Sequence, residues 1–291
     1  MLKTFFKLLL STVIYTVIFI LANATAPFSQ GVRELGTSGS PWGLLLMFIT
    51  PSWICFTIYY IIRHAQVAGK KLFLYIVFTM FFAQLFMAQI ETLFFGDAFP
   101  ALTKRDILLI MIASFIPLLV TVPVMIKFFR NTNAEIETEK PDIKSLLKKL
   151  GIIGLIYLCV YFTFGYFAAW QFEELRIFYS GSPEKLNFFA HLVNIAKTKP
   201  VIFPFQILRG ILFGIFVIPL INIFNTKKAF VTSICLIFLY LGITFLVPNA
   251  LFPDRVRAGH FIEFLSVYSV CSPKVYSRQL FRTIALKLSI Q

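Results

Sequence analysis

Charged residues are scarce in this 291-residue chain, and acidic residues are scarcer than basic ones. Only 14% of the residues are Asp, Glu, Lys or Arg, against about 25% in a typical soluble domain, while 58% are hydrophobic. The mean hydropathy is correspondingly high, at +0.83. This composition excludes an ordinary soluble domain and predicts a protein that folds in lipid.

The chain also lacks recognisable patterns of metal-binding or phosphate-binding residues. Its 4 cysteines and 3 histidines are spread singly, so no pair has the spacing of a zinc or redox motif. Neither an HExxH motif nor a glycine-rich phosphate loop occurs. We therefore expect no metal and no cofactor, and we interpret the cysteines as packing residues.

Long apolar runs, in contrast, occupy most of the sequence. A helix needs about 20 apolar residues to cross the hydrocarbon core of a membrane. Seven segments meet this requirement, and an eighth, residues 256–272, is shorter and more polar. The seven strong segments are residues 5–21, 42–62, 72–95, 107–129, 150–170, 201–224 and 229–247. We predict an all-α bundle of about eight transmembrane spans that forms a single domain over residues 1–291.

The basic residues predict the orientation of this bundle, because loops rich in Lys and Arg stay in the cytoplasm. If the N-terminus is inside and the eight spans alternate, the inner side has a net charge of +13 and the outer side +1, which together give the formal +14. We therefore expect both termini inside, in a multi-pass protein of a bacterial inner membrane or plasma membrane. The inner excess of base indicates anionic inner-leaflet lipids as partners and gives no reason to expect nucleic acid.

Two connecting segments are long. Residues 130–149, between the fourth and fifth spans, are polar and basic, and we interpret them as a cytoplasmic loop. Residues 171–199 follow the fifth span and are expected outside. Within them, Ser182 and Pro183 are typical of a helix start, and apolar residues then recur at helical spacing. We predict a short amphipathic helix that lies on the outer surface.

The polar residues inside the predicted spans fall mostly in the outer halves of the third, fifth, sixth and eighth spans. An ionisable side chain that faces lipid costs several kcal/mol, so such residues normally turn inward and pair. We predict one buried polar site, which binds a small molecule. Its candidate residues are Gln84, Gln89, Glu91, Gln171, Glu173, Arg176, Gln206, Arg209, Arg257, His260 and Glu263.

Two carboxylates of this set especially need cationic partners. Glu91 and Glu173 are both expected near the C-terminus of a helix, where the helix dipole disfavours negative charge. Arg209, Arg257 and Arg176 are expected at the same depth, and bidentate Arg–carboxylate pairs are a stable way to bury such charges. We predict ion pairs between these two groups of residues.

The sequence around Glu91 has a counterpart in the next span. Residues 89–93, QIETL, recur as residues 171–175, QFEEL, each at the expected outer end of an odd-numbered span. We therefore hypothesise that the third and fourth spans and the fifth and sixth spans are duplicated hairpins. Transporters built from such repeats bind their substrates at the repeat interface.

Three interpretations of the polar site remain open. In the first, it binds or transports a small polar or amphipathic molecule, which includes lipid-like ones. In the second, His260 and Glu263, with Glu91 or Glu173, provide the acid–base or metal chemistry of an intramembrane hydrolase. In the third, the residues form an ion-pair network that fixes helix register and does no chemistry. We favour the first interpretation and do not expect an enzyme.

Overall fold

The structure of the protein is a computed structural model that describes residues 2–36, 47–130, 142–221, 223–224, 226–247 and 251–271. Every extended regular element in these ranges is a helix, and the one β-type contact there is an isolated bridge between Ala65 and Phe224. The predicted all-α fold is confirmed for this part of the chain.

Within the described residues, six helices are long and apolar enough to cross a membrane. Four are single helices: α1 (Leu2–Thr25), α7 (Lys104–Phe129), α11 (Ile202–Ile221) and α12 (Lys227–Leu246). The other two are compound. One runs through α5 (Gly69–Met80), the π-helical turn η1 (Phe81–Phe86) and α6 (Met87–Phe94), and the other through α8 (Ile143–Phe167) and the 3-10 turn η3 (Ala169–Gln171).

Two further helices occupy the places of the second and eighth predicted spans. These are α4 (Ile49–His64) and α13 (Asp254–Cys271). Helix α4 has 16 residues, and residues 42–46, at the start of this predicted span, lie outside the described part. The 18 residues of α13 are the most polar of the long helices, since its first three turns carry both acids and bases. These two helices are therefore less apolar or shorter than the six membrane-length helices.

Short helices lie between the long ones: α2 (Gln30–Gly36), η2 (Gly96–Ala98), α9 (Glu173–Ser180) and α10 (Phe188–Thr198). Helix α10 begins later than Ser182 and Pro183 predict, because Asn187 caps it by accepting a hydrogen bond from the Ala190 N–H at 2.9 Å. Helix α8 likewise begins within the predicted 130–149 loop. The Asp142 carboxylate caps it, and residues 131–141 of that loop lie outside the described part.

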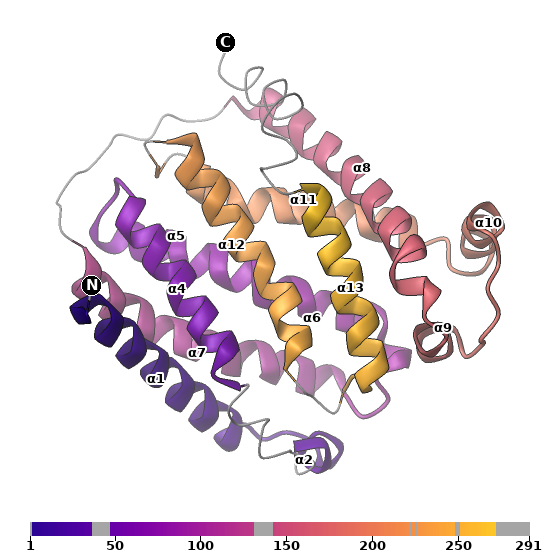
Figure 1. The fold of residues 1–291 in the computed structure, drawn as a ribbon, viewed down its shortest axis with the longest axis horizontal. Coiled ribbons are helices and arrows are strands. Elements are labelled where there is room, and N and C mark those ends of the chain that lie inside the picture. The colour runs from indigo at the N-terminus through magenta and orange to yellow at the C-terminus, as the bar shows by residue number, and fades with distance from the viewer. Residues whose placement is uncertain are drawn as a thin grey trace.

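Helix α1 lies along α7 at one edge of the bundle, and α8 lies along α11 at the opposite edge (Figure 1). Between these edges, α4 and α5 supply much of the fully buried core, as do residues of α7 and α11. These core residues include Ile54, Ile58, Ile61, Leu72, Ile76, Met80, Leu118 and Leu220. Large apolar side chains remain exposed on the outward faces of the long helices, as expected for helices that face lipid.

Glycines allow the close contact between α8 and α11. A Cβ atom at Gly210 would lie 2.6 Å from the Tyr157 Cβ, and one at Gly154 would lie 2.8 Å from the Ile207 carbonyl oxygen. Such distances are shorter than any tolerated van der Waals contact, so the two backbones approach closely only because both positions are glycine. This contact brings Tyr157 next to the polar residues of α11.

The two segments on which the duplicated-hairpin hypothesis was based have different structures. Residues 89–93 continue the helix α6, whereas residues 171–175 follow the end of α8 and span a break before α9. The packing also differs, because α7 makes its most extensive contact with α1, which lies outside its own hairpin, whereas α11 makes its most extensive contact with α8 of its own hairpin. The hypothesis of duplicated hairpins is therefore wrong at the residues that motivated it.

Candidate functional site

The predicted Arg–carboxylate pair is present between α6 and α11. Arg209 Nη1 donates to Glu91 Oε1 at 2.8 Å, and Arg209 Nη2 donates to Glu91 Oε2 at 2.6 Å. The Arg209 side chain is 5% exposed and the Glu91 side chain 38% exposed. The bidentate geometry is the strong form of this interaction. The guanidinium is buried, while the carboxylate lies at the edge of the packed interior.

Neighbouring groups on α8 and α11 surround the Arg209 guanidinium. Its Nη1 also donates to Gln206 Oε1 at 3.0 Å, and the carbon of the guanidinium lies 5.6 Å from the Tyr157 ring centre and 5.8 Å from that of Phe205. Gln206 is completely buried, and its Nε2 has no hydrogen-bond partner among the described residues, nor has Arg209 Nε. The pair therefore has aromatic faces around the cation and two buried donors that lack acceptors.

A second polar group joins α9 to α13. The Tyr179 hydroxyl lies 2.9 Å from His260 Nε2, and His260 Nδ1 lies 3.3 Å from Glu263 Oε2. The His260 and Glu263 side chains are 18% and 21% exposed, and the imidazole stacks on the Phe245 ring. Burial raises the pKa of Tyr179 well above its usual value, and the charges of Glu91 and Glu263 add to this effect. Tyr179 therefore keeps its proton.

One face of α8 connects the two groups. Tyr157, Tyr161 and Gly165 follow at intervals of four residues, so they lie on the same side of the helix. Tyr157 lies over Arg209, and a Cβ atom at Gly165 would lie 3.6 Å from Glu263 Oε1. Tyr161, between them, is within electrostatic range of Glu91, Arg209 and Glu263. We call these residues, together with Gln206, His260 and Tyr179, the polar cluster.

Gln84 lies apart from the polar cluster, although it precedes Glu91 by seven residues and was expected on nearly the same face. It is 1% exposed, and its Nε2 donates to the Ile237 carbonyl oxygen of α12 at 3.0 Å. The physical reason is the π-helical turn 81–86, which winds more slowly than an α-helix and so changes the face on which later residues lie. Gln89 is half-buried on α6.

Two other candidates have structural roles near the loop between α8 and α10. Arg176 is buried, but it pairs with no carboxylate among the described residues. Its Nε donates to the Pro183 carbonyl at 2.7 Å, and its Nη1 donates to the carbonyls of Trp170 and Gln171 at 2.8 and 3.1 Å. The Gln171 side chain is exposed, donates to the Tyr166 carbonyl and accepts from Lys185. The predicted role of Arg176 as the partner of a buried glutamate is wrong.

Glu173 and Arg257 also differ from their predicted roles. Glu173 is exposed in the first turn of α9, where the helix dipole favours a negative charge. The prediction placed it at a helix C-terminus because the break after Phe167 was not foreseen. Arg257 Nη2 donates to Asp254 at 2.6 Å and its Nη1 donates to the Phe245 carbonyl, so it pairs with neither Glu91 nor Glu173.

A cavity of about 320 Å³ lies next to the polar cluster, between the end of α6, α9 and the connection from α10 to α11. Phe94 and Phe205 stack in parallel, with ring centres 3.8 Å apart, one turn from Glu91 and Arg209 respectively. The cavity is therefore adjacent to the ion pair along the same two helices. Its lining residues are Phe94, Phe95, Asp97, Ala98, Tyr179, Thr198, Lys199, Pro200 and Val201.

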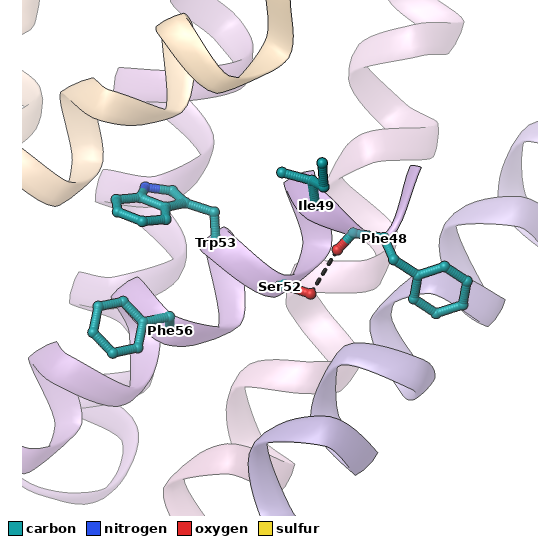
Figure 2. Close-up of a pocket in the computed structure, with 5 residues that line it drawn as sticks. All are labelled: Phe48, Ile49, Ser52, Trp53 and Phe56. Carbon is teal, nitrogen blue, oxygen red and sulfur yellow. Dashed lines mark hydrogen bonds between the residues drawn. The ribbon is translucent and has the colours of Figure 1, made fainter. Parts of the chain in front are cut away.

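A second hollow, of about 390 Å³, lies on α4 and is almost entirely apolar (Figure 2). It is lined by Phe48, Ile49, Ser52, Trp53 and Phe56. The Ser52 hydroxyl already donates to the Phe48 carbonyl at 2.6 Å, and the Trp53 indole N–H donates to the Leu236 carbonyl. These residues offer no charged group to a ligand, so the hollow lacks the chemistry of the polar cluster.

Over the part of the chain that the structure describes, no group of three or more His, Cys, Asp or Glu side chains could hold a metal ion. Comparisons with protein-family models, with curated proteins and with solved structures found no match to this chain.

Proposed function

We propose that this polytopic membrane protein binds, and moves across part of the membrane, a small polar or amphipathic molecule at the polar cluster. The observation that carries the proposal is the Glu91–Arg209 pair. Its Arg209 side chain is buried, while its Glu91 side chain remains 38% exposed near an aromatic-lined cavity. A pair that only fixed helix register would have little advantage, because well-packed apolar residues in its place are often equally stable or more stable.

The residue types around the pair support a binding role. Ligand sites are mostly apolar and aromatic, with a few convergent polar groups that fix orientation. The cavity next to the cluster has this character, since Phe94, Phe95 and Tyr179 lie beside Asp97 and Lys199. The π-helical turn 81–86, just before Glu91, is a rare distortion of the kind that is frequent at functional sites.

In the proposed orientation both termini are cytoplasmic, and the polar cluster opens toward the opposite side of the membrane. Lys and Arg residues gather at the end of the bundle that holds Lys7, Arg63, Lys70, Lys71 and Lys127, which supports a cytoplasmic position for that end. We expect this basic end to contact anionic lipids of the inner leaflet.

A thermal-shift screen of purified protein in detergent tests the binding role. The probes are lysophosphatidylethanolamine, lysophosphatidylglycerol, glutamate and tetraphenylphosphonium. A probe whose free concentration is 100 times its dissociation constant stabilises the fold by about 2.7 kcal/mol. We expect at least one probe to stabilise the wild type and the control variant Glu173→Gln, but not Glu91→Gln. If no probe stabilises the wild type, or if Glu91→Gln responds equally, the binding role is refuted.

A further inference from the structure

Among the residues that the structure describes, no Lys or Arg pairs with Glu263, the second carboxylate of the polar cluster. Arg209 is bound to Glu91, Arg257 is bound to Asp254, and Arg255 lies 3.4 Å from Glu174. Arg176 of α9 donates to three backbone carbonyls. Among the described residues, Gly165 of α8, Tyr179 of α9 and Phe245 of α12 lie against Glu263 or His260, and none of them carries a charge. The nearest ionic group is the Glu91–Arg209 pair, which is within electrostatic range of Tyr161, as Glu263 is.

His260 is placed so that it can hold a proton or lack one without losing a hydrogen bond. The imidazolium donates from Nδ1 to Glu263 and from Nε2 to the Tyr179 oxygen. The neutral imidazole with its proton on Nδ1 still donates to Glu263, and its Nε2 accepts from the Tyr179 hydroxyl. The Tyr179 hydroxyl serves both states because it can donate or accept. The protonated pair is neutral overall, and the deprotonated pair has one negative charge.

A single buried negative charge requires either a proton or a cation, because an unbalanced charge in a membrane interior is costly. The surroundings suit a cation. The Glu91 and Glu263 side chains are both partly exposed, and the Arg209 guanidinium already lies over the faces of two aromatic rings. Further rings, those of Phe94, Phe95 and Tyr179, line the cavity beside the cluster. Carboxylates together with aromatic faces are the groups that recognise organic ammonium and onium ions.

We propose that the ligand of the polar cluster is an amphipathic organic cation, an amine or onium ion, which takes the place of the proton held by His260 and Glu263. The cation lies between the Glu91 and Glu263 carboxylates, and its apolar part occupies the aromatic cavity. One positive charge enters and one proton leaves to water through His260 and Tyr179, so the net charge of the cluster stays the same. This inference rests on the proposed function and specifies its substrate class.

The test compares tetraphenylphosphonium with tetraphenylborate, two ions of nearly the same size and shape but opposite charge, on the purified full-length protein in detergent. Binding is measured by equilibrium dialysis, and proton release by a pH-sensitive dye in weakly buffered solution. We expect the cation to bind at least about tenfold more tightly than the anion, with release of up to about one proton per cation. Its affinity should rise with pH, because proton and cation compete.

Glu263→Gln and His260→Gln should each abolish proton release and weaken cation binding by about tenfold or more. The matched control is Glu173→Gln, which removes an exposed carboxylate of the neighbouring helix α9 and should bind and release protons as the wild type does. Wild-type protein alone already tests the inference if a variant fails to fold. Equal binding of both ions, or cation binding without proton release, overturns the cation–proton exchange but leaves the binding function intact. Absence of binding by either ion, by all lysolipids and by glutamate overturns both.

Discussion

The Glu91–Arg209 pair predicts an unequal cost for removing its two members. Glu91→Gln keeps the shape of the side chain but leaves the Arg209 guanidinium, which is 5% exposed, without its counter-charge. Removing one partner of a buried pair in this way costs about 3–5 kcal/mol. Arg209→Met leaves Glu91, which is 38% exposed and can be hydrated or take up a proton, so we expect a smaller cost of about 1–3 kcal/mol.

The double variant Glu91→Gln/Arg209→Met distinguishes the cost of an unpaired buried charge from the cost of lost contacts. When both charges are absent, no buried charge is left unpaired, and replacing a buried pair by neutral residues is often close to neutral. We therefore expect the double variant to be more stable than Glu91→Gln alone. The free energy of unfolding is measurable in dodecylmaltoside micelles with increasing fractions of sodium dodecyl sulfate, followed by tryptophan fluorescence. Equal costs for the two single variants, or costs that simply add in the double variant, would refute the assignment of the buried charge to Arg209.

Three further predictions follow from other contacts. Gly210→Ala should destabilise the fold by about 1–3 kcal/mol in the same unfolding assay, because the new methyl group would lie 2.6 Å from the Tyr157 Cβ. Arg176→Lys should cost about 1–3 kcal/mol, because one ammonium cannot reach all three carbonyls that the guanidinium binds. Burial lowers the pKa of His191 below its ordinary value of 6.5, so the detached helix α10 takes up the proton more readily than the docked one. Docking of α10 should therefore be complete above pH 6.5 and weaken as the pH falls below it, with a change in the fluorescence of Trp170, whose ring centre lies 4.9 Å from that of His191.

Each of these predictions has a matched control. Gly151→Ala adds a methyl group on α8 that meets nothing within 4 Å, so it should not destabilise the fold. Arg255→Lys changes a side chain that is 78% exposed and should alter stability by less than about 0.5 kcal/mol. His191→Gln should remove the pH response, whereas His64→Gln should preserve it. The prediction for Gly210 would be contradicted if Gly151→Ala were equally destabilising. The one for Arg176 would be contradicted if Arg176→Lys were neutral, and the one for His191 if the pH response persisted in His191→Gln.

Composition and apolar run length were sufficient to predict an all-helical bundle, because a membrane helix must satisfy its own backbone and present apolar side chains. The same physical constraint led to the Glu91–Arg209 pair, since both residues are charged within apolar runs and few alternatives exist at that depth. The predicted ion pair of Glu173 was wrong, because the position of this residue depends on where α8 ends. The break after Phe167 involves no proline or glycine, so local sequence gives no sign of it.

The tyrosines of the polar cluster were not predicted as site residues. Tyr157, Tyr161 and Tyr179 are amphipathic residues of a kind that is common in membrane helices, and only the close approach of α8 to α11 and of α9 to α13 shows what their hydroxyls and rings contact. The spacing of four residues between Tyr157, Tyr161 and Gly165 was the available indication, because it aligns them on one helical face. Arg176, in contrast, was predicted as a site residue but has a structural role. A charge count does not include backbone carbonyls, which accept three hydrogen bonds from this guanidinium.

The π-helical turn 81–86 determines toward which side each later residue of the second membrane-length helix points. In an α-helix each residue advances by about 100° around the axis. Shortening this turn by a single residue, so that a regular α-helix is restored, would rotate Glu91 by roughly that angle and turn its carboxylate away from α11. The one extra residue of the π-helical turn, although distant along the chain, therefore orients the Glu91 carboxylate toward the Arg209 guanidinium.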